Sequence, residues 1–328
     1  MARKRRPRPD DGRGRGGFQR HHFNRFRSVT AGLLPDVPRH GRGIVLMLGS
    51  ALSLSVMNAA VKALTLSGYH TLQIVLTDCL FGFASVFLWL AATGRLRWAR
   101  RLRPMLAGYV AAAICACFSL FYGFGHGGLA QISAVVAAAP LLVAVLSFFF
   151  LGERLTRWQV TLALAGFGGI LLILQPGMDM QASLPLIVTL GGTFALAASQ
   201  VLVRYLNGQI HTAAFILYFY VGAAAVSGAL VVGNGLWTPV AAGDMPLFLL
   251  CALADIAALV CMYSAFRHAP ASLVTPFQYS NIVWSALLGY VIWQEQPGLW
   301  TAMGAGIIIG AGVLFTRAAL RRQQAAAA

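Results

Sequence analysis

The sequence predicts an all-α integral membrane protein with ten transmembrane helices in two inverted five-helix repeats. Composition is the first observation, because 58% of the 328 residues are hydrophobic and only 10% are charged, whereas soluble domains carry roughly 25% charged residues. The second is that the apolar residues form long runs, each near the about 20 residues that a helix needs to cross a bilayer. The third is that the second half of the chain repeats the first at a fixed offset. These features exclude a soluble protein.

Ten apolar runs follow residue 42, and Gly, Pro and Asn residues interrupt the chain between them, as is typical of connections. The expected spans are 43–67, 71–92, 104–125, 129–151, 158–175, 184–206, 212–232, 245–266, 271–292 and 300–316. Only helices and closed barrels satisfy their backbone hydrogen bonds in lipid, and runs of this length are too long for barrel strands. The first five spans form one repeat over 43–175, and the last five form the second over 184–316.

Residues 1–42 are expected to be a disordered basic cytoplasmic tail. They hold twelve Lys and Arg against three acidic residues, so they contribute +9 of the formal net charge of +16. Few large apolar residues are present to form a core. A polybasic segment beside a span is attracted to anionic lipid headgroups, so we expect the bilayer and not nucleic acid as its partner. Residues 317–328 are expected to be a second, short cytoplasmic tail.

The arginines between the spans predict the orientation of the chain. Short cytoplasmic connections are enriched in Lys and Arg. With the N-terminus inside, the inner connections and the C-terminal tail carry twelve arginines, and the five outer connections carry no Lys or Arg. The twelve are Arg95, Arg97, Arg100, Arg101, Arg103, Arg154, Arg157, Arg204, Arg267, Arg317, Arg321 and Arg322. We therefore expect a multi-pass protein of the cell inner membrane with both termini in the cytoplasm.

The internal repeat has one constant offset and needs no gap. It aligns unlike residue types that are rare in an apolar chain: Asn58 with Gln200, Lys62 with Arg204, His126 with His268, Glu153 with Glu295, and Trp158 with Trp300. Each repeat has an odd number of spans, so the second lies upside down relative to the first. Inverted repeats are typical of secondary transporters, in which they allow alternating access to a site near the bilayer midplane.

The ends of the fourth and ninth spans resemble a known family. The run Phe148–Arg154 leads into Trp158, and Gly289–Glu295 leads into Trp300. Together with the ten spans in two halves, these segments are similar to the EamA-type transporters of the drug/metabolite transporter superfamily. The resemblance covers about residues 43–316. It implies transport of a small organic solute, with Glu153 and Glu295 as the helix-end signature. One departure is Asp78, which lies in the second span where many relatives have a basic residue.

Ionisable residues inside the membrane are costly and point to function. Asp78 and Asp255 fall well within the second and eighth spans, and Lys62 lies toward the outer end of the first. Asp255 has no charged neighbour in sequence, so we expect it to bind substrate or a coupling proton. Asp78 has either the same role or a structural pairing with Lys62. Lys62 alternatively extends to the headgroups, as long basic side chains do.

Polar stripes at helical spacing supply further candidates for a solute site. Ser55, Asn58 and Lys62 share one face of the first span, and Gln278, Asn281 and Ser285, with Trp284 beside them, do so in the ninth. These stripes suit either a polar cavity or hydrogen bonds between helices. Two weaker candidates are Gln200 and Tyr122.

Other motifs have structural interpretations. We expect Glu153 and Glu295 to cap backbone groups or to pair locally, and a gating role is the alternative. The pattern Gly306-x-x-x-Gly310 predicts close helix packing. All five cysteines lie within spans and no His or Cys cluster has ligand spacing, so we expect neither a metal site nor a cofactor.

These observations predict a secondary active transporter of a small polar organic metabolite that works by alternating access. The resemblance favours export of an amino acid or an amino-acid-derived metabolite, such as a metallophore. The alternatives are an uptake carrier for a cofactor-like metabolite and a channel-like facilitator. Proton coupling through Asp255 or Asp78 is compatible with buried carboxylates. No Walker loop or hydrolase motif is present in the sequence, and we expect the protein not to be an enzyme.

Overall fold

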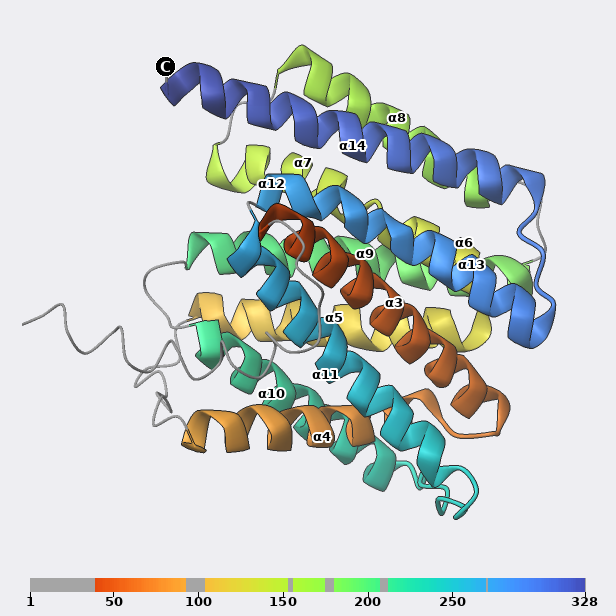
Figure 1. Ribbon diagram of the computed structural model, residues 1–328. Coiled ribbons are helices and arrows are strands. Elements are labelled where there is room, and N and C mark those ends of the chain that lie inside the picture. The colour runs from red at the N-terminus through yellow and green to blue at the C-terminus, as the bar shows by residue number, and fades with distance from the viewer. Residues whose placement is uncertain are drawn as a thin grey trace, which may run out of the picture.

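The computed structural model describes residues 39–92, 104–152, 156–174, 180–206, 212–269 and 271–327. All regular secondary structure within them is helical (Figure 1). The helices are α3 (Arg39–Leu66), α4 (Thr71–Ala92), α5 (Pro104–His126), α6 (Leu129–Val136), α7 (Ala139–Leu151), α8 (Arg157–Leu174), α9 (Met180–Tyr205), α10 (Thr212–Gly233), α11 (Met245–His268), α12 (Ala271–Val274), the short 3₁₀ segment η1 (Thr275–Tyr279), α13 (Ser280–Trp293) and α14 (Leu299–Ala327). The predicted all-helical membrane fold is confirmed.

Nine segments of the described chain are long and apolar enough to cross a membrane, with α6 and α7 counted together. The remaining expected span, the ninth (271–292), is not one continuous helix but α12, η1 and α13 in succession. Pro276 lies in η1. Proline has no N–H for the helical ladder and disfavours helical geometry in the residue before it, which accounts for the interruption.

The two repeats share these backbone irregularities. The break between α6 and α7 falls at Ala137 and Ala138, and the junction of η1 and α13 falls at the equivalent positions of the second repeat, Tyr279 and Ser280. Helices α7 and α13 also end alike. The equivalent residues Gly152 and Gln294 both have left-handed backbone conformations, with φ of 67° and 57°. The repeat is therefore a property of the backbone as well as of the side chains.

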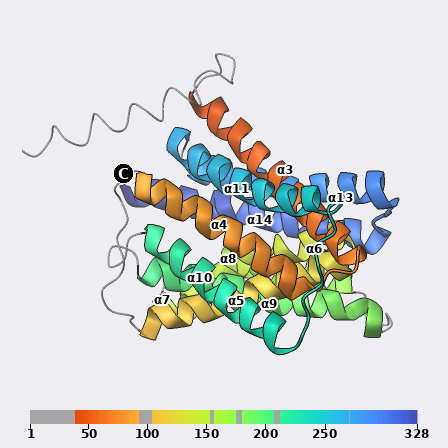
Figure 2. The ribbon, with the colours of Figure 1, turned by 90° about the horizontal axis from the view of Figure 1, so that it is seen from below.

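Helices of one repeat pack chiefly against helices of the other. α3 packs on α11, and the equivalent pair, α9 and α5, packs in the same way. The pairs α4 with α10 and α8 with α14 each join equivalent helices of the two repeats, and Figures 1 and 2 show both pairs side by side. The largest buried apolar cluster draws on both halves, as Leu64 and Ile282 illustrate. The two repeats therefore form one bundle with a shared core.

The helices alternate in direction along the chain. The connections 67–70, 127–128, 234–244 and 294–298 all lie at one end of the bundle, on the right in Figure 1. We call this the outer end, and the C-terminus lies at the opposite, inner end. α3 begins at Arg39, inside the segment predicted as a disordered tail over 1–42, and α14 stays helical through most of the predicted tail 317–328. Residues 1–38 lie outside the described residues.

The close helix packing predicted at Gly306 and Gly310 is wrong. A Cβ atom added at either glycine would meet nothing within 4 Å. The close approach is instead at Gly304 and Gly169, where a Cβ added at Gly304 would lie 2.5 Å from the Gly169 carbonyl oxygen and one added at Gly169 would lie 2.8 Å from that of Gly304. Spacing alone could not select the face of α14 that meets α8.

This contact gives the first testable prediction. Gly304→Ala must separate α8 from α14, because backbone atoms cannot rotate away as a side chain does, and overpacking of this kind costs about 1–3 kcal/mol. We expect a lower midpoint of thermal unfolding for the purified protein in detergent. Gly306→Ala on the same helix is the matched control and should not lower the midpoint. Equal midpoints for the two variants would contradict this packing.

Candidate functional site

Serine and asparagine side chains form a buried cluster where α3, α6 and α13 meet. Ser133 donates to Ser285 at 2.7 Å, and Ser285 donates to Ser55 at 3.3 Å. Ser55 in turn donates to the backbone carbonyl of Asn281, at 3.1 Å, and to its side-chain oxygen. These four residues, with Asn58, are the central cluster. The two polar stripes predicted in the first and ninth spans therefore face each other and bond between helices.

The central cluster lies beside both helix breaks. Asn281 is the second residue of α13, and Ser133 lies in the last turn of α6. Interrupted helices at corresponding positions of inverted repeats are the usual setting of a transporter's solute site, because they place free backbone groups and polar side chains at membrane depth. Ser133 was not predicted from the sequence. Pro140, just after the break between α6 and α7, was the signal in the sequence that could have directed attention to this segment.

Two of the buried side-chain donors that find no hydrogen-bond partner among the described residues lie on the helices that form this cluster. They are the side-chain amide of Asn58, a residue only 2% exposed, and the indole N–H of Trp284. They belong to α3 and α13, which pack against each other. An unsatisfied buried donor costs about 1–3 kcal/mol, which an oxygen atom of a bound solute would recover. Gln278, by contrast, donates to the sulfur of Met262 at 3.5 Å and so contacts α11.

Asp78 and Asp255 form a second site, the carboxylate pair, between α4 and α11. Tyr220 on α10 donates to Asp255 at 3.1 Å, and the Cys251 thiol lies 3.9 Å from an oxygen of Asp78. Because Cys251 and Asp255 are one turn apart on the same helix face, Asp78 and Asp255 lie across one helix contact. Tyr220 was missed from the sequence, although the internal repeat aligns it with Asp78.

Within the described residues neither carboxylate forms an ion pair with Lys or Arg. A lone ionised carboxylate in a low-dielectric interior is costly, and the cost is removed by a proton or by a cation. The pair is thus suited to exchanging a proton for another positively charged group.

The absence of a side chain at Gly82 leaves the space that the Tyr220 ring occupies beside the carboxylate pair. A Cβ atom added at Gly82 would lie 2.5 Å from the Tyr220 ring, whereas one added at Gly228, on the same α4–α10 contact, would lie 3.6 Å from Leu76. We expect Gly82→Ala to displace the ring from Asp255 and to lower the transport rate about tenfold, and Gly228→Ala to leave it unchanged. Tyr220→Phe, which removes the hydroxyl without crowding, should act in the same direction as Gly82→Ala. Normal transport by Tyr220→Phe would contradict a role for this hydrogen bond.

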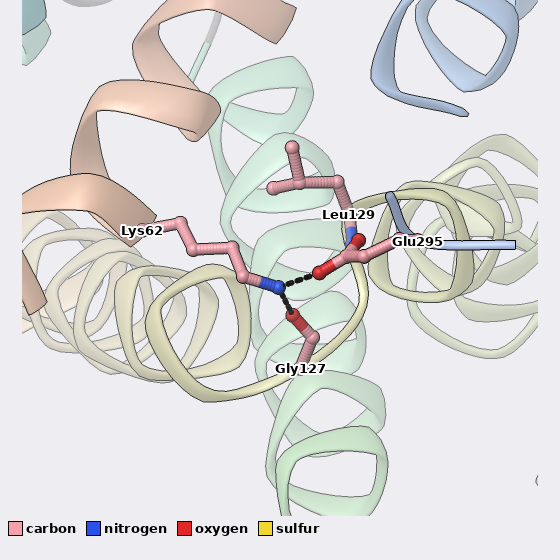
Figure 3. A network of polar contacts seen from close by, with 4 residues as sticks. All are labelled: Lys62, Gly127, Leu129 and Glu295. Carbon is pink, nitrogen blue, oxygen red and sulfur yellow. Dashed lines mark hydrogen bonds and ion pairs between the residues drawn. The ribbon is translucent and has the colours of Figure 1, made fainter. Parts of the chain in front are cut away.

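Lys62 and Glu295 form the third polar site, the outer ion pair (Figure 3). The Lys62 ammonium also donates to the Gly127 carbonyl at 2.8 Å, and the backbone N–H of Leu129 donates to the second carboxylate oxygen of Glu295 at 3.0 Å. The proposed pairing of Lys62 with Asp78 is not formed, because Asp78 lies well inside α4 while Lys62 lies in the last turns of α3.

The other expected roles of these two residues also change. Lys62 is only 8% exposed and does not extend to the headgroups. Glu295 does cap a backbone N–H, at the start of α6, but both of its partners lie in the other repeat and are not local.

The remaining candidates lie apart from these sites. Gln200 is exposed on α9. Tyr122 stacks on His126 with ring centroids 4.3 Å apart and lines a hollow at the outer end. Arg204 is exposed and donates to Ser147 on α7 at 3.2 Å. Glu153 lies outside the described residues. Among the residues that the structure describes, no group of three or more His, Cys, Asp or Glu side chains is arranged to hold a metal ion.

Comparison with known proteins adds an independent line of evidence. The chain matches the EamA-like transporter family over residues 41–175 and again over 183–317, two segments that coincide with the two repeats. It is 28% identical over 277 residues to the pseudopaline exporter CntI of Pseudomonas aeruginosa, covering 84% of this chain and 96% of that protein. It is 29% identical to the riboflavin transporter of Rhizobium johnstonii, covering 59% and 64%. A solved structure with 20% identity shares the fold, with a TM-score of 0.55 over 87% of this chain and 97% of that one.

Proposed function

Because this chain belongs to the EamA-like transporter family, we propose that it is a secondary active transporter of a small polar organic metabolite that works by alternating access. The observation that carries the proposal is the central cluster, which lies at breaks in two equivalent helices of an inverted repeat. This arrangement gives a polar site that each repeat, by moving against the other, opens to one side of the membrane in turn.

The chemistry of the interior supports a substrate that carries both an acceptor oxygen and a positive group. The donors of Asn58 and Trp284 suit a carboxylate or carbonyl oxygen, and the carboxylate pair suits an ammonium group. An amino acid or an amino-acid-derived metabolite has both. A metallophore of this kind is within the same chemical class.

We propose export as the direction, driven by protons that enter through the carboxylate pair. The relative named as a pseudopaline exporter supports this direction. The second candidate is uptake of a cofactor-like metabolite, and the relative named as a riboflavin transporter supports a substrate of that class. The proposed location is the cell inner membrane with both termini in the cytoplasm, on the strength of the twelve arginines expected at the inner end.

Counterflow in proteoliposomes tests the proposal. Comparison of the spent medium of deletion and overexpressing cells first selects the metabolite, with riboflavin and pseudopaline as the first two probes. Liposomes preloaded with unlabelled compound should then accumulate the labelled compound transiently above equilibrium, because a carrier returns faster when loaded. A channel-like facilitator cannot do this. Uptake of the labelled compound at the same rate with and without unlabelled compound inside the liposomes would therefore contradict the proposal.

A further inference from the structure

The outer ion pair joins the two repeats at the outer end of the bundle. Lys62 lies near the end of α3, in the first repeat, and Glu295 follows α13, in the second. Figure 3 shows the Glu295 carboxylate held between the Lys62 ammonium and the Leu129 backbone N–H, so that both of its oxygens are bound. A single side chain of one repeat is therefore held by two elements of the other.

The backbone after α13 is shaped to place Glu295 there. Gln294 adopts a left-handed conformation with φ of 57°, and Glu295 N–H bonds back to the Gly289 carbonyl at 3.1 Å. This turn returns the side chain over α13. A Cβ atom at Gly289 would lie 2.8 Å from the Glu295 carboxylate, so the absence of a side chain at this position makes the room that the carboxylate occupies.

The Lys62–Glu295 pair is only partly buried, which allows it both to hold the two repeats together and to break when the outer end opens. The side chains of Lys62 and Glu295 are 11% and 26% exposed, and the Lys62 ammonium lies 5.4 Å from the centre of the Trp293 ring. In this setting water screens the attraction between the two charges less than at an open surface, where an ion pair is worth about 0–1 kcal/mol. When the outer end opens, water hydrates the Lys62 ammonium and the Glu295 carboxylate, and this hydration compensates for the loss of the attraction between them. Partial burial therefore suits a pair that breaks and re-forms.

Two hollows at the outer end are lined by residues that adjoin or belong to this pair. One is lined in part by Gly128, Gln131 and Glu295, and the other by Thr65, one turn beyond Lys62, and by His126. Gly127, whose carbonyl accepts a hydrogen bond from Lys62, falls in sequence between His126, which lines one hollow, and Gly128, which lines the other. Glu295 itself lines the first hollow, so the ion pair lies at the edge of an opening at the outer end.

We propose that the Lys62–Glu295 pair is a lock that holds the outer side of the transport pathway closed. The proposal rests on the proposed function, since it assigns a conformational role within the alternating cycle. In the closed state the Glu295 carboxylate clamps α13 to α3 and α6. Opening to the outside requires Glu295 to leave Lys62 and Leu129, and closure is complete when it returns.

Labelling of a buried thiol from outside tests the lock without any substrate. Cys251 is 1% exposed and adjoins Asp78 in the proposed pathway. In a parent variant whose other cysteines (Cys79, Cys115, Cys117 and Cys261) are alanine, a membrane-impermeant maleimide added to intact cells reports access from the outer side. We expect Lys62→Ala and Glu295→Ala to raise the labelling rate of Cys251 at least tenfold, with no rise from the inner side in inverted vesicles.

Gly289→Ala is a second route to the same state, because it displaces the Glu295 carboxylate while both charges remain. It should raise outside labelling at least threefold, whereas Gly306→Ala, whose Cβ meets nothing within 4 Å, should not. The reversed pair Lys62→Glu with Glu295→Lys should return labelling at least halfway to the parent rate. The lock is overturned if the disrupted variants label at the parent rate, or if labelling rises equally from both sides.

This measurement separates the lock from the transport proposal. Labelling requires neither a metabolite nor a proton gradient, so a failure here leaves counterflow untouched. Conversely, a protein that shows no counterflow with any metabolite but still exposes Cys251 on disruption of the pair would retain the lock and lose the proposed function.

Discussion

Asp78→Asn and Asp255→Asn should each lower transport driven by a proton gradient at least tenfold. In the proposed cycle each carboxylate accepts a proton from outside as the metabolite leaves the site, and releases that proton inside as the next metabolite binds. Asparagine has the shape of the protonated acid but cannot release a proton, so the cycle loses its coupling. Export by the parent protein, measured in proteoliposomes, should rise as the outside becomes more acidic, and export by the variants should be independent of the gradient.

Asp244→Asn is the matched control for these variants. Asp244 lies in an outer connection, accepts a hydrogen bond from Tyr69 at 2.9 Å and has no part in the proposed coupling. It should keep the pH dependence of the parent. Counterflow by Asp78→Asn or Asp255→Asn should persist in part, since exchange does not need net proton movement. If transport by Asp78→Asn and by Asp255→Asn both depended on the proton gradient as transport by the parent does, the carboxylate pair would have no role in coupling.

Two buried asparagines on facing helices should respond to the same substitution with opposite signs. Asn58→Leu removes a buried donor that has no acceptor among the described residues. Since such an unsatisfied group costs about 1–3 kcal/mol, the substitution should raise the midpoint of thermal unfolding. Asn281→Leu removes the oxygen that accepts from Ser55, and should lower the midpoint. Interhelical hydrogen bonds in membranes are worth about 0.6–2 kcal/mol, which sets the size of the second effect.

Transport should separate the two asparagines in a different way. If the Asn58 amide binds the solute, Asn58→Leu should raise the KM for counterflow about tenfold, equivalent to about 1.4 kcal/mol of binding free energy, in a protein that is more stable than the parent. A destabilised Asn58→Leu variant, or one with an unchanged KM, would contradict the assignment of Asn58 to the solute site.

The helical membrane fold could be predicted because it depends on the length and spacing of apolar runs, which a single sequence displays directly. The break in the ninth span was missed, since Pro276 lies within a run that remains apolar throughout. Its equivalent position in the fourth span shows the same break just before Pro140. The two prolines are not at equivalent positions, because Pro276 precedes its break and Pro140 follows its own, but a proline within a few residues of each break was the signal that could have located both.

The partners of the polar residues could not be predicted. Lys62 and Glu295 are separated by 233 residues, and Ser55 and Asn281 by 226. The acid that a lysine contacts depends on how each helix is rotated in the bundle and how deep it lies. The pattern of apolar residues does not determine either quantity when a span is hydrophobic on all sides. For this reason a pairing with Asp78, the nearer acid in sequence, was one of the alternatives expected for Lys62, and a pairing with Glu295 was not.

The internal repeat predicts which helices and helix breaks the two halves share, but it does not predict which side chains form the carboxylate pair. Asp78 is equivalent to Tyr220 and Asp255 is equivalent to Ala113, so the two halves share helix positions but differ in chemistry. The carboxylate pair combines one residue from each repeat with a tyrosine from the second. An inverted pair of this kind forms a symmetric scaffold around an asymmetric site.

Direct measurement of proton movement tests the central claim most closely. Proteoliposomes with a trapped pH indicator receive, on one side, the metabolite that counterflow has identified. The parent protein should move protons opposite to the metabolite, and the double variant Asp78→Asn with Asp255→Asn should move none, whereas the control Asp244→Asn should move protons like the parent. Equal proton movement by the parent and the double variant, or metabolite transport by the parent without proton movement, would contradict coupling through the carboxylate pair.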